Sequence, residues 1–423
     1  MSKPRSKIKV FCCCLIFVLL TTGCWGRRET DELGYILATG IDKSEENIVK
    51  VTFQIAVPSA LAGGGGGGGD KATEVISVEA ASLFGALQLA NSFVSRDLTF
   101  IHNELVVVSE EIAREGLDRY INPFLRSREI RRNITIAVSQ GSAAEFLKNN
   151  EPVLEKNSAR QFELLFSAKG FTGFIIDTTL NEFSKKAKSP GANPVLTLVG
   201  VIKEQKKNKT EEASDFAKMV REEVSYLPGE IPREGGNKIE IIGLAAFKKD
   251  RLVGYLNGTE TRYYQMMTGN FNSAILTIPE PDLKDRIIVV KVTRGRSPET
   301  KVDISGDKPK IRVKVILEGE ILSIQSGTNY EQGQKAEELE QLIEDLVKSG
   351  ASEVIKKTQV DFKSDIFGFG EGTRKAFWTW QEWINYGWLE RYAEAEVDVD
   401  ISLEIRRTGL MRRTAPIPEE GSQ

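Results

Sequence analysis

The sequence predicts an α+β, multi-domain fold with mixed and antiparallel sheets and packed helices, on three observations. Period-two strand patterns and helical patterns follow one another in mixed order along the chain. The longest helical pattern, residues 331–360, has one apolar stripe and a charged remainder, which is typical of a helix lying on a sheet. Residues 397–405 alternate strictly between apolar and polar. We therefore expect a C-terminal domain in which a long helix covers an antiparallel sheet.

Strand and helix patterns are interspersed in the first half of the chain. Residues 49–57 alternate with period two and predict a half-buried strand, and Ser142 is expected to cap a short helix. The remaining patterns predict strands at 34–41, 99–109, 133–139 and 194–203, and helices at 79–94, 110–125, 151–168 and 177–188.

The second half begins with a predicted hairpin, residues 239–247 and 252–256. Further strands are expected at 287–293 and 311–317. The helix at 331–360 would run roughly 45 Å at about 1.5 Å per residue.

Composition shifts divide the chain. The clearest boundary is a charged segment with scattered Pro and Gly, poor in apolar residues, at 204–238. Seven consecutive glycines at 63–69 are interpreted as a flexible surface loop, because no Gly-Lys-Ser/Thr ending follows them. The predicted units are a signal peptide at 1–23, an N-terminal α+β domain at 24–203, a polar linker or excursion at 204–238, a middle β-rich domain at 239–305, a C-terminal α+β domain at 306–410 and a flexible tail at 411–423.

The N-terminus has the parts of a lipoprotein signal peptide. Four basic residues lie within the first nine positions, and the apolar run at 10–20 has about half of the ~20 residues that a membrane-spanning helix needs. Small residues then lead to Gly23 and Cys24, although Thr21 stands where the common pattern has Leu. We predict cleavage between Gly23 and Cys24, with diacylglycerol on the sulfur of Cys24 and an N-acyl group such as palmitate. An ordinary secretory signal or an uncleaved anchor is the alternative.

Cysteine usage and charge limit other roles. Cys24 is the only cysteine outside the predicted signal peptide, so no disulfide is expected and stability must come from apolar cores. The whole chain has a net charge of −3, and removal of residues 1–23 with their four basic residues leaves −7. A mildly acidic surface does not favour nucleic acid as a partner. Membrane attachment would therefore depend on lipid rather than on positive charge.

The sequence offers little material for catalysis. His102 is the only histidine, and Gly-x-Ser-x-Gly is absent. Without a second histidine or spare cysteines, no structural zinc site is expected. The glycines at 368–372 lack the spacing of a phosphate-binding loop and are interpreted as a turn. We predict no enzyme, no metal and no cofactor beyond the covalent lipid; paired carboxylates stay open, because many chance pairs exist.

Aromatic and basic clusters are the remaining candidates for contact. Four of the five tryptophans lie at 378–388. On one helix, Trp380 and Trp388 would share a core-facing side with Phe377 and Ile384, whereas Trp378 would point elsewhere. Exposed aromatic residues in this segment are candidates for a contact with a partner protein or with lipid headgroups, and we predict this contact for Trp378 and Trp383. Four arginines between 126 and 132 are interpreted as solvated charge, with an acidic partner or lipid headgroups as the alternative.

Four stretches together resemble the Ger(x)C family, the lipoprotein C subunits of bacterial spore germinant receptors. No single stretch is diagnostic, but their order covers nearly the whole mature chain. The glycine run at 63–69 and the excursion at 204–238 are departures that look particular to this chain. The stretches are CWGRRE at 24–29 with GID at 40–42, residues 96–102 with 104–113, GLAAFK at 243–248 with LVGYL at 252–256, and residues 365–370 with the tryptophan segment and the strand up to Gly409.

The resemblance implies an α+β protein of three domains without catalytic residues, anchored through Cys24 on the outer face of the cytoplasmic membrane, here the spore inner membrane. It implies a multi-spanning A subunit and a transporter-like B subunit as partners, in a receptor for amino acids, sugars or nucleosides that is needed for germination. The alternative is an extracytoplasmic solute-binding lipoprotein. That alternative expects two α/β lobes joined by a hinge, which the predicted C-terminal half does not favour.

Overall fold

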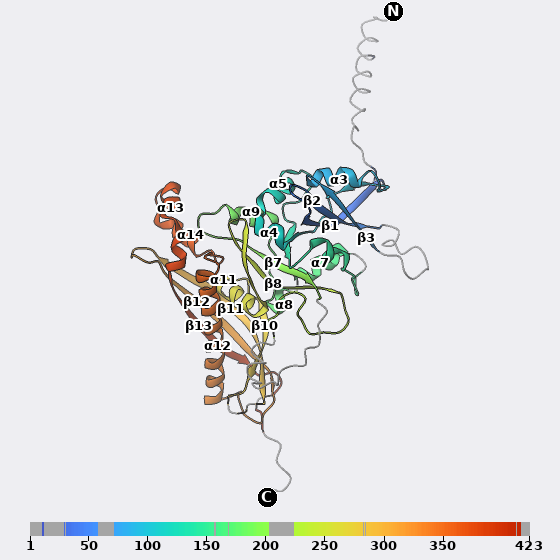
Figure 1. The fold of residues 1–423 in the computed structure, drawn as a ribbon. Coiled ribbons are helices and arrows are strands. Elements are labelled where there is room, and N and C mark those ends of the chain that lie inside the picture. The colour runs from blue at the N-terminus through green and yellow to red at the C-terminus, as the bar shows by residue number, and fades with distance from the viewer. Residues whose placement is uncertain are drawn as a thin grey trace, which may run out of the picture.

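The computed structural model describes residues 11, 29, 31–57, 72–155, 158–167, 169–202, 224–281, 283, 285–411 and 413–415. Two sheets with packed helices organise this part of the chain (Figure 1), so the predicted α+β fold is confirmed. Gly23, Cys24 and the glycine run at 63–69 lie outside the described residues, as does much of the predicted excursion at 204–238.

The first sheet has nine strands in the order β3-β2-β1-β5-β6-β7-β8-β9, with β4 paired to β1. Its centre, β1-β5-β6-β7, is parallel, and the pairs on either side are antiparallel. The strands are β1 Leu33–Lys43, β2 Val49–Ala56, β3 Thr73–Ala80, β4 Asp97–Thr99, β5 Leu105–Ser109, β6 Thr135–Ser139, β7 Val195–Val201, β8 Ile239–Lys248 and β9 Arg251–Leu256.

Helices cover both faces of this sheet. In β5, Val106 and Val108 face one core and Leu105 and Val107 face the other, as the alternation of side chains along a strand requires. A strand covered on both sides is apolar throughout, which explains its unbroken valine run. One face carries α3 Leu83–Ala90, α4 Glu110–Glu115, α5 Asp118–Arg126 and α9 Leu180–Ala187; α6 Ala143–Lys148 and α7 Ser158–Ser167 pack on the other, and α8 Lys169–Thr172 follows α7.

The second sheet has the order β10-β11-β12-β13, with strands β10 Ser273–Pro279, β11 Ile287–Asp303, β12 Lys310–Ile324 and β13 Glu396–Arg407. The long helix α12, Gln334–Val360, lies on it with a buried stripe that includes Leu339, Ile343 and Val347. One part of the prediction is wrong: β13 pairs with β12 in parallel, so this sheet is mixed rather than antiparallel. The reason is that α12 and the segment after it form a crossover that returns the chain to the same end of the sheet.

The two sheets share a packed boundary built around α11, Gly258–Thr268. The side-chain amide of Gln265 donates 2.9 Å hydrogen bonds to the carbonyls of Gly173 and Ile175. The Ser364 hydroxyl donates to the Phe247 carbonyl at 2.6 Å. Residues 239–305 contribute β8 and β9 to the first sheet and β10 and β11 to the second. The division into domains stays a prediction.

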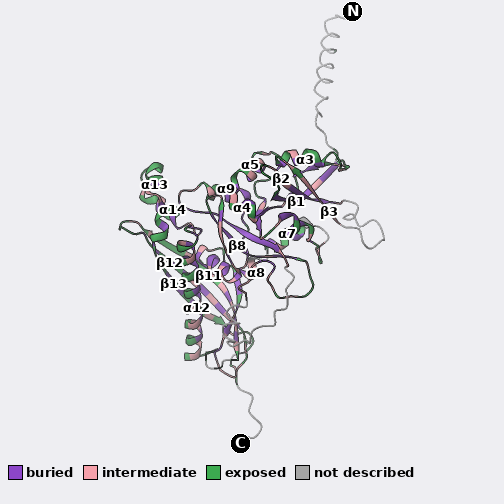
Figure 2. Ribbon diagram, in the orientation of Figure 1, coloured by how far each residue is buried: buried purple, intermediate pink, exposed green. Residues whose placement is uncertain are grey.

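Four short elements lie between α12 and β13: η1 Phe369–Ala376, α13 Trp380–Tyr386, α14 Trp388–Arg391 and η2 Tyr392–Glu394. Buried residues concentrate along both sheets, whereas α13 and the outer side of α12 are largely exposed (Figure 2). No helix in the described ranges is long and apolar enough to cross a membrane.

Candidate functional site

The carboxyl ends of β1, β5 and β6 meet at one edge of the first sheet, where parallel sheets commonly bind ligands. An open crevice of ≈ 560 Å³ lies there. It is lined by Asp42, Lys43, Lys50, Ser109, Glu110, Glu111, Arg114, Gly141 and Ser142.

Asp42 occupies the amino end of α6 from within this crevice. Its buried carboxylate accepts hydrogen bonds from the backbone N–H of Ala143 at 2.7 Å and of Ala144 at 2.8 Å. Burial raises the pKa of Asp42, and these N–H groups oppose that rise. Ser142 caps the same helix, as the sequence predicted. An anionic ligand would have to displace the Asp42 carboxylate from the amino end of α6. We therefore interpret this hydrogen bonding as structural and not as a ligand-binding site.

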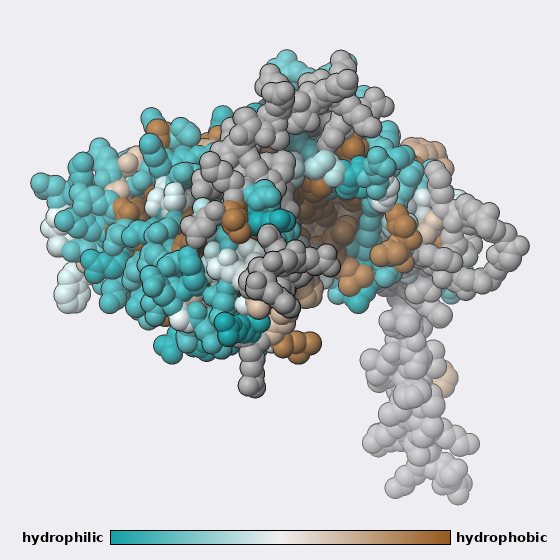
Figure 3. Space-filling view, turned by 90° about the horizontal axis from the view of Figure 1, so that it is seen from below, coloured by the Kyte–Doolittle hydropathy of each residue, from teal (hydrophilic) through white to brown (hydrophobic). Residues whose placement is uncertain are grey.

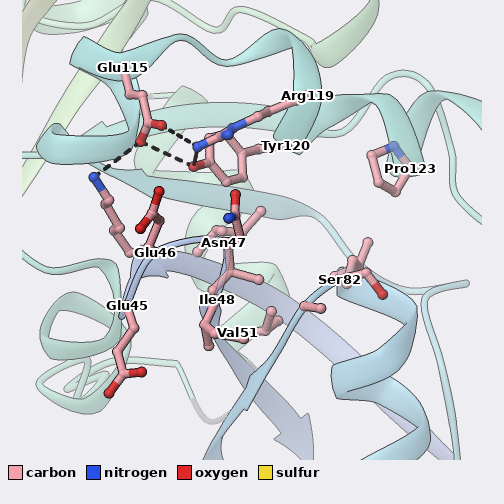
Figure 4. A pocket seen from close by; sticks show the side chains of 15 residues that line it. Glu45, Glu46, Asn47, Ile48, Val51, Ser82, Glu115, Arg119, Tyr120 and Pro123 are labelled. Carbon is pink, nitrogen blue, oxygen red and sulfur yellow. Dashed lines mark hydrogen bonds and ion pairs between the residues drawn. The ribbon is translucent and has the colours of Figure 1, made fainter.

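A second cavity, ≈ 680 Å³, adjoins the first and shares Lys43 with it. It lies between the turn after β1, the amino end of α3 and helix α5 (Figure 4). Its lining residues are Ile41, Lys43, Glu45, Glu46, Asn47, Ile48, Val49, Val51, Ala81, Ser82, Leu83, Glu115, Arg119, Tyr120 and Pro123.

Ion pairs already use the charges on the wall of this cavity. Lys43 Nζ lies 3.5 Å from Glu115 Oε2 and 3.6 Å from Glu111 Oε1. Glu115 also pairs with Arg119, and Figure 4 shows Glu115 turned toward Arg119 and Tyr120. The Glu115 carboxylate raises the pKa of the Lys43 ammonium. A small polar solute would have room here, but its charges would compete with these ion pairs.

Other predicted candidates are separated in space or lack catalytic partners. His102 lies in the exposed turn after β4, with its ring edge-on to Tyr35 at 4.9 Å between centroids. The arginines between 126 and 132 are exposed, and Arg131 lies 3.8 Å from Glu104. Among the described residues, no group of His, Cys, Asp and Glu could hold a metal ion.

The tryptophan segment does not form one helix. Gly387, with φ +67°, ends α13 and begins α14, so Trp380 and Trp388 do not share a helix face as predicted. Trp378 is 95% exposed, whereas Trp383 is only 2% exposed. Trp383 is therefore buried and not available for the surface contact that the sequence predicted for it, whereas the contact of Trp378 stays a prediction.

A buried carboxylate that the sequence did not single out fixes this segment. Asp365 accepts hydrogen bonds from the N–H of Gly368 at 2.9 Å, the N–H of Gly370 at 3.0 Å and the indole Nε1–H of Trp388 at 2.8 Å. Burial raises the Asp365 pKa to about 6, although the three donors favour its charged form. The turn expected at 368–372 is held by Asp365: Gly368 has φ +78° and η1 follows it.

The same segment is attached to the first sheet. The carbonyl of Asp365 accepts from the N–H of Asn193 at 2.8 Å, and the Asn193 side chain accepts from the N–H of Lys249 at 2.7 Å. A Cβ at Gly191 would lie 2.6 Å from the ring of Trp383, so only glycine allows this approach. The exposed residues around Trp378 are therefore presented from a rigid base.

Comparisons with known proteins match the N-terminal and the C-terminal part of the chain to one family of proteins. A family model described as a spore germination protein N-terminal domain matches residues 26–201, and one described as spore germination B3/GerAC like, C-terminal, matches residues 242–409. The chain belongs to the Ger(x)C family. Its predicted family resemblance is thereby confirmed.

Full-length relatives support the assignment. Spore germination protein KC of Bacillus subtilis (strain 168) is 27% identical over 96% of both chains. Spore germination protein B3 of the same organism is 23% identical over 96% of this chain and 99% of its own length. The crystal structure of the GerBC protein shares the fold, with a TM-score of 0.51, 16% identity and coverage of 87% of this chain and 96% of its own.

Proposed function

We propose that this Ger(x)C chain is a non-catalytic subunit of a nutrient germinant receptor. In this proposal, lipid on Cys24 holds it on the outer face of the spore inner membrane, and it works through contacts with the integral membrane A and B subunits. The observation that carries the proposal is that the N-terminal and the C-terminal family models both match the chain, one after the other. Germination proteins that match over nearly their whole length support it.

Two buried carboxylates make structural hydrogen bonds: Asp42 holds the amino end of α6, and Asp365 holds the tryptophan segment. The exposed Trp378 is the proposed contact for a membrane subunit or for lipid headgroups.

A germination assay tests the receptor role. In a strain that lacks its other germinant receptors, deletion of this subunit is expected to abolish the response to nutrients. A normal response in that strain would refute the receptor assignment. Co-purification with the A and B subunits, compared between the natural chain and Trp378→Ser, tests the proposed contact; unchanged recovery would remove Trp378 from it.

Lipid attachment is tested at Cys24 in the full chain. Cys24→Ala is expected to abolish incorporation of an alkyne-tagged fatty acid and to release the protein from membranes. Cys13→Ala, within the predicted signal peptide, is the matched control and should be labelled normally. Undiminished labelling of Cys24→Ala would refute the anchor.

The ≈ 680 Å³ cavity keeps the solute-binding alternative testable. Calorimetry on the natural protein with candidate amino acids, sugars and nucleosides is expected to show no saturable binding. Micromolar binding that weakens in Lys43→Ala would favour the alternative, because Lys43 lies on the wall of this cavity.

A further inference from the structure

Helix α3 presents large apolar side chains to solvent. Its inner side is buried through Leu83, Ala86 and Ala90. On its outer side, Phe84 is 44% exposed and Leu89 is 49% exposed, and Phe93, just after the helix, is 62% exposed. We call Phe84, Leu89 and Phe93 the α3 patch. Three large apolar side chains exposed within ten residues of one another in the sequence make this segment a candidate interaction site.

The segment around the α3 patch carries no charge. Residues 80–95 contain no Asp, Glu, Lys or Arg, although charged residues make up 28% of the chain. Its polar side chains are serine, glutamine and asparagine. A surface helix in water ordinarily has charged residues on its outer face, which α3 lacks. A surface without charges can move into an apolar medium without the cost of burying an ion.

The α3 patch lies beside the start of the folded chain. Just after Phe93, Asp97 pairs with Leu33 at the first position of β1, and Arg96 Nη1 donates to the Leu33 carbonyl at 3.3 Å. Leu33 follows Cys24 by nine residues, which span at most ~32 Å when fully extended. A lipid on Cys24 therefore keeps this part of the molecule close to the bilayer.

Other features agree with a lipid-facing end. Helices α3 and α13 both lie along the upper edge of the molecule in Figure 1, and α13 carries the exposed Trp380. Figure 3 shows the molecule from below, the face away from this edge, where much of the surface is hydrophilic and apolar groups gather mainly on one half. Aromatic side chains are favoured at the level of the lipid headgroups.

We propose that the α3 patch inserts into the outer leaflet beside the lipid anchor. This inference rests on the anchor proposed above. The patch would lie in the headgroup region as interfacial amphipathic helices do, with its buried side still covering the sheet. A single flexible attachment leaves a domain free to rotate over the membrane, whereas two attachments fix its orientation. Because residues 80–95 are uncharged, insertion needs no anionic lipid and resists salt.

A fluorescent reporter tests the insertion. Once the predicted signal peptide is removed and Cys24 carries lipid, the chain has no free thiol, so Ser92→Cys can be labelled with an environment-sensitive dye. The protein is reconstituted in vesicles of phosphatidylethanolamine and phosphatidylglycerol, and in neutral vesicles of phosphatidylcholine. The control is Glu337→Cys on the exposed side of α12. At position 92 we expect emission at shorter wavelength, quenched by nitroxide lipids in both vesicle types; at position 337 neither effect is expected.

A matched variant separates insertion from anchoring. Leu89→Gln with Phe93→Gln, carrying the same reporter, should lose the quenching while it still floats with the vesicles through its lipid. Aqueous emission from the natural patch in a chain that floats would overturn the insertion but leave the anchor intact. Shorter-wavelength emission without nitroxide quenching would indicate a protein contact and would also overturn it. A chain that neither floats nor takes up fatty acid contradicts the proposed function itself.

Discussion

Replacing Asp365 by alanine is expected to destabilise the protein strongly. The change removes the acceptor for three donors, the N–H groups of Gly368 and Gly370 and the indole of Trp388. Asp365 is fully buried, so water cannot replace its carboxylate without entering the core. Each unpaired buried donor costs about 1–3 kcal/mol, and some relaxation will recover part of this. We therefore expect a loss of about 4 kcal/mol in the free energy of unfolding.

Urea unfolding followed by tryptophan fluorescence measures this loss, because Trp383 and Trp388 are buried close to Asp365. Asp361→Ala is the control: it lies four residues earlier, is exposed and should change stability by less than about 0.5 kcal/mol. A loss below about 1 kcal/mol in Asp365→Ala would refute the reasoning, since it would mean that the three donors find other acceptors.

Three further outcomes are expected. The Asp365 pKa rises from 3.8 to about 6 on folding, so between these values the folded chain keeps a proton that the unfolded chain releases. The contribution of Asp365 to the free energy of unfolding therefore falls by about 3 kcal/mol as pH rises through this window, and it is constant above it. Urea titrations at several pH values should show this fall as a change in the difference in free energy of unfolding between the natural chain and Asp365→Asn. A difference that does not change with pH would contradict the burial argument. Gly191→Ala should lower the midpoint of thermal unfolding, because its Cβ would lie 2.6 Å from the Trp383 ring, and an unchanged midpoint would show that the ring can move freely. Glu240→Ala should lower the free energy of unfolding by about 2–4 kcal/mol, since the buried carboxylate accepts a hydrogen bond from Arg233 Nε at 2.9 Å. A loss below about 1 kcal/mol in urea unfolding, the size expected for an exposed ion pair, would contradict this reasoning.

Long periodic patterns were the part of the fold that the sequence could predict. The helix expected at 331–360 is α12, Gln334–Val360, and the strand expected at 397–405 is β13, Glu396–Arg407. The predicted hairpin at 239–256 forms β8 and β9. Each has enough residues for its apolar period to be distinct from chance.

Shorter elements were less predictable, for local reasons. The helix expected at 79–94 is limited to Leu83–Ala90, because Ser82 caps it and β3 continues to Ala80. The single helix expected at 110–125 is two, since Gly116 has φ +125° between α4 and α5. Helix α11 was not predicted, because its buried residues serve two cores, with Met266 and Met267 in one and Tyr264 in the other. Strand β10 was not predicted either, although Ala274, Leu276 and Ile278 alternate on one face as a strand requires.

The candidate sites depended on contacts between distant residues. Asp365 looks like one of sixty acidic residues in the sequence, and only the fold brings it to Trp388 and Asn193. Parallel pairing of β13 with β12 likewise depends on the path of the crossover, which alternation within a strand does not encode. The exposure of Trp378 and the burial of Trp383 follow from a break at Gly387 that helical spacing did not predict.

The length of helix α12 determines how far a small rotation at one of its ends would move the other end. Its carboxyl end is held at the boundary between the two sheets, where Lys357 Nζ lies 2.7 Å from Glu260 Oε1 of α11, and its 27 residues make a rod of about 40 Å. A tilt of about 5° there would move the amino end of α12, together with the second sheet on which it packs, through ~3.5 Å for a rod with ~1.5 Å rise per residue. Small rocking movements beside the first sheet are thus magnified at the remote tip of the second.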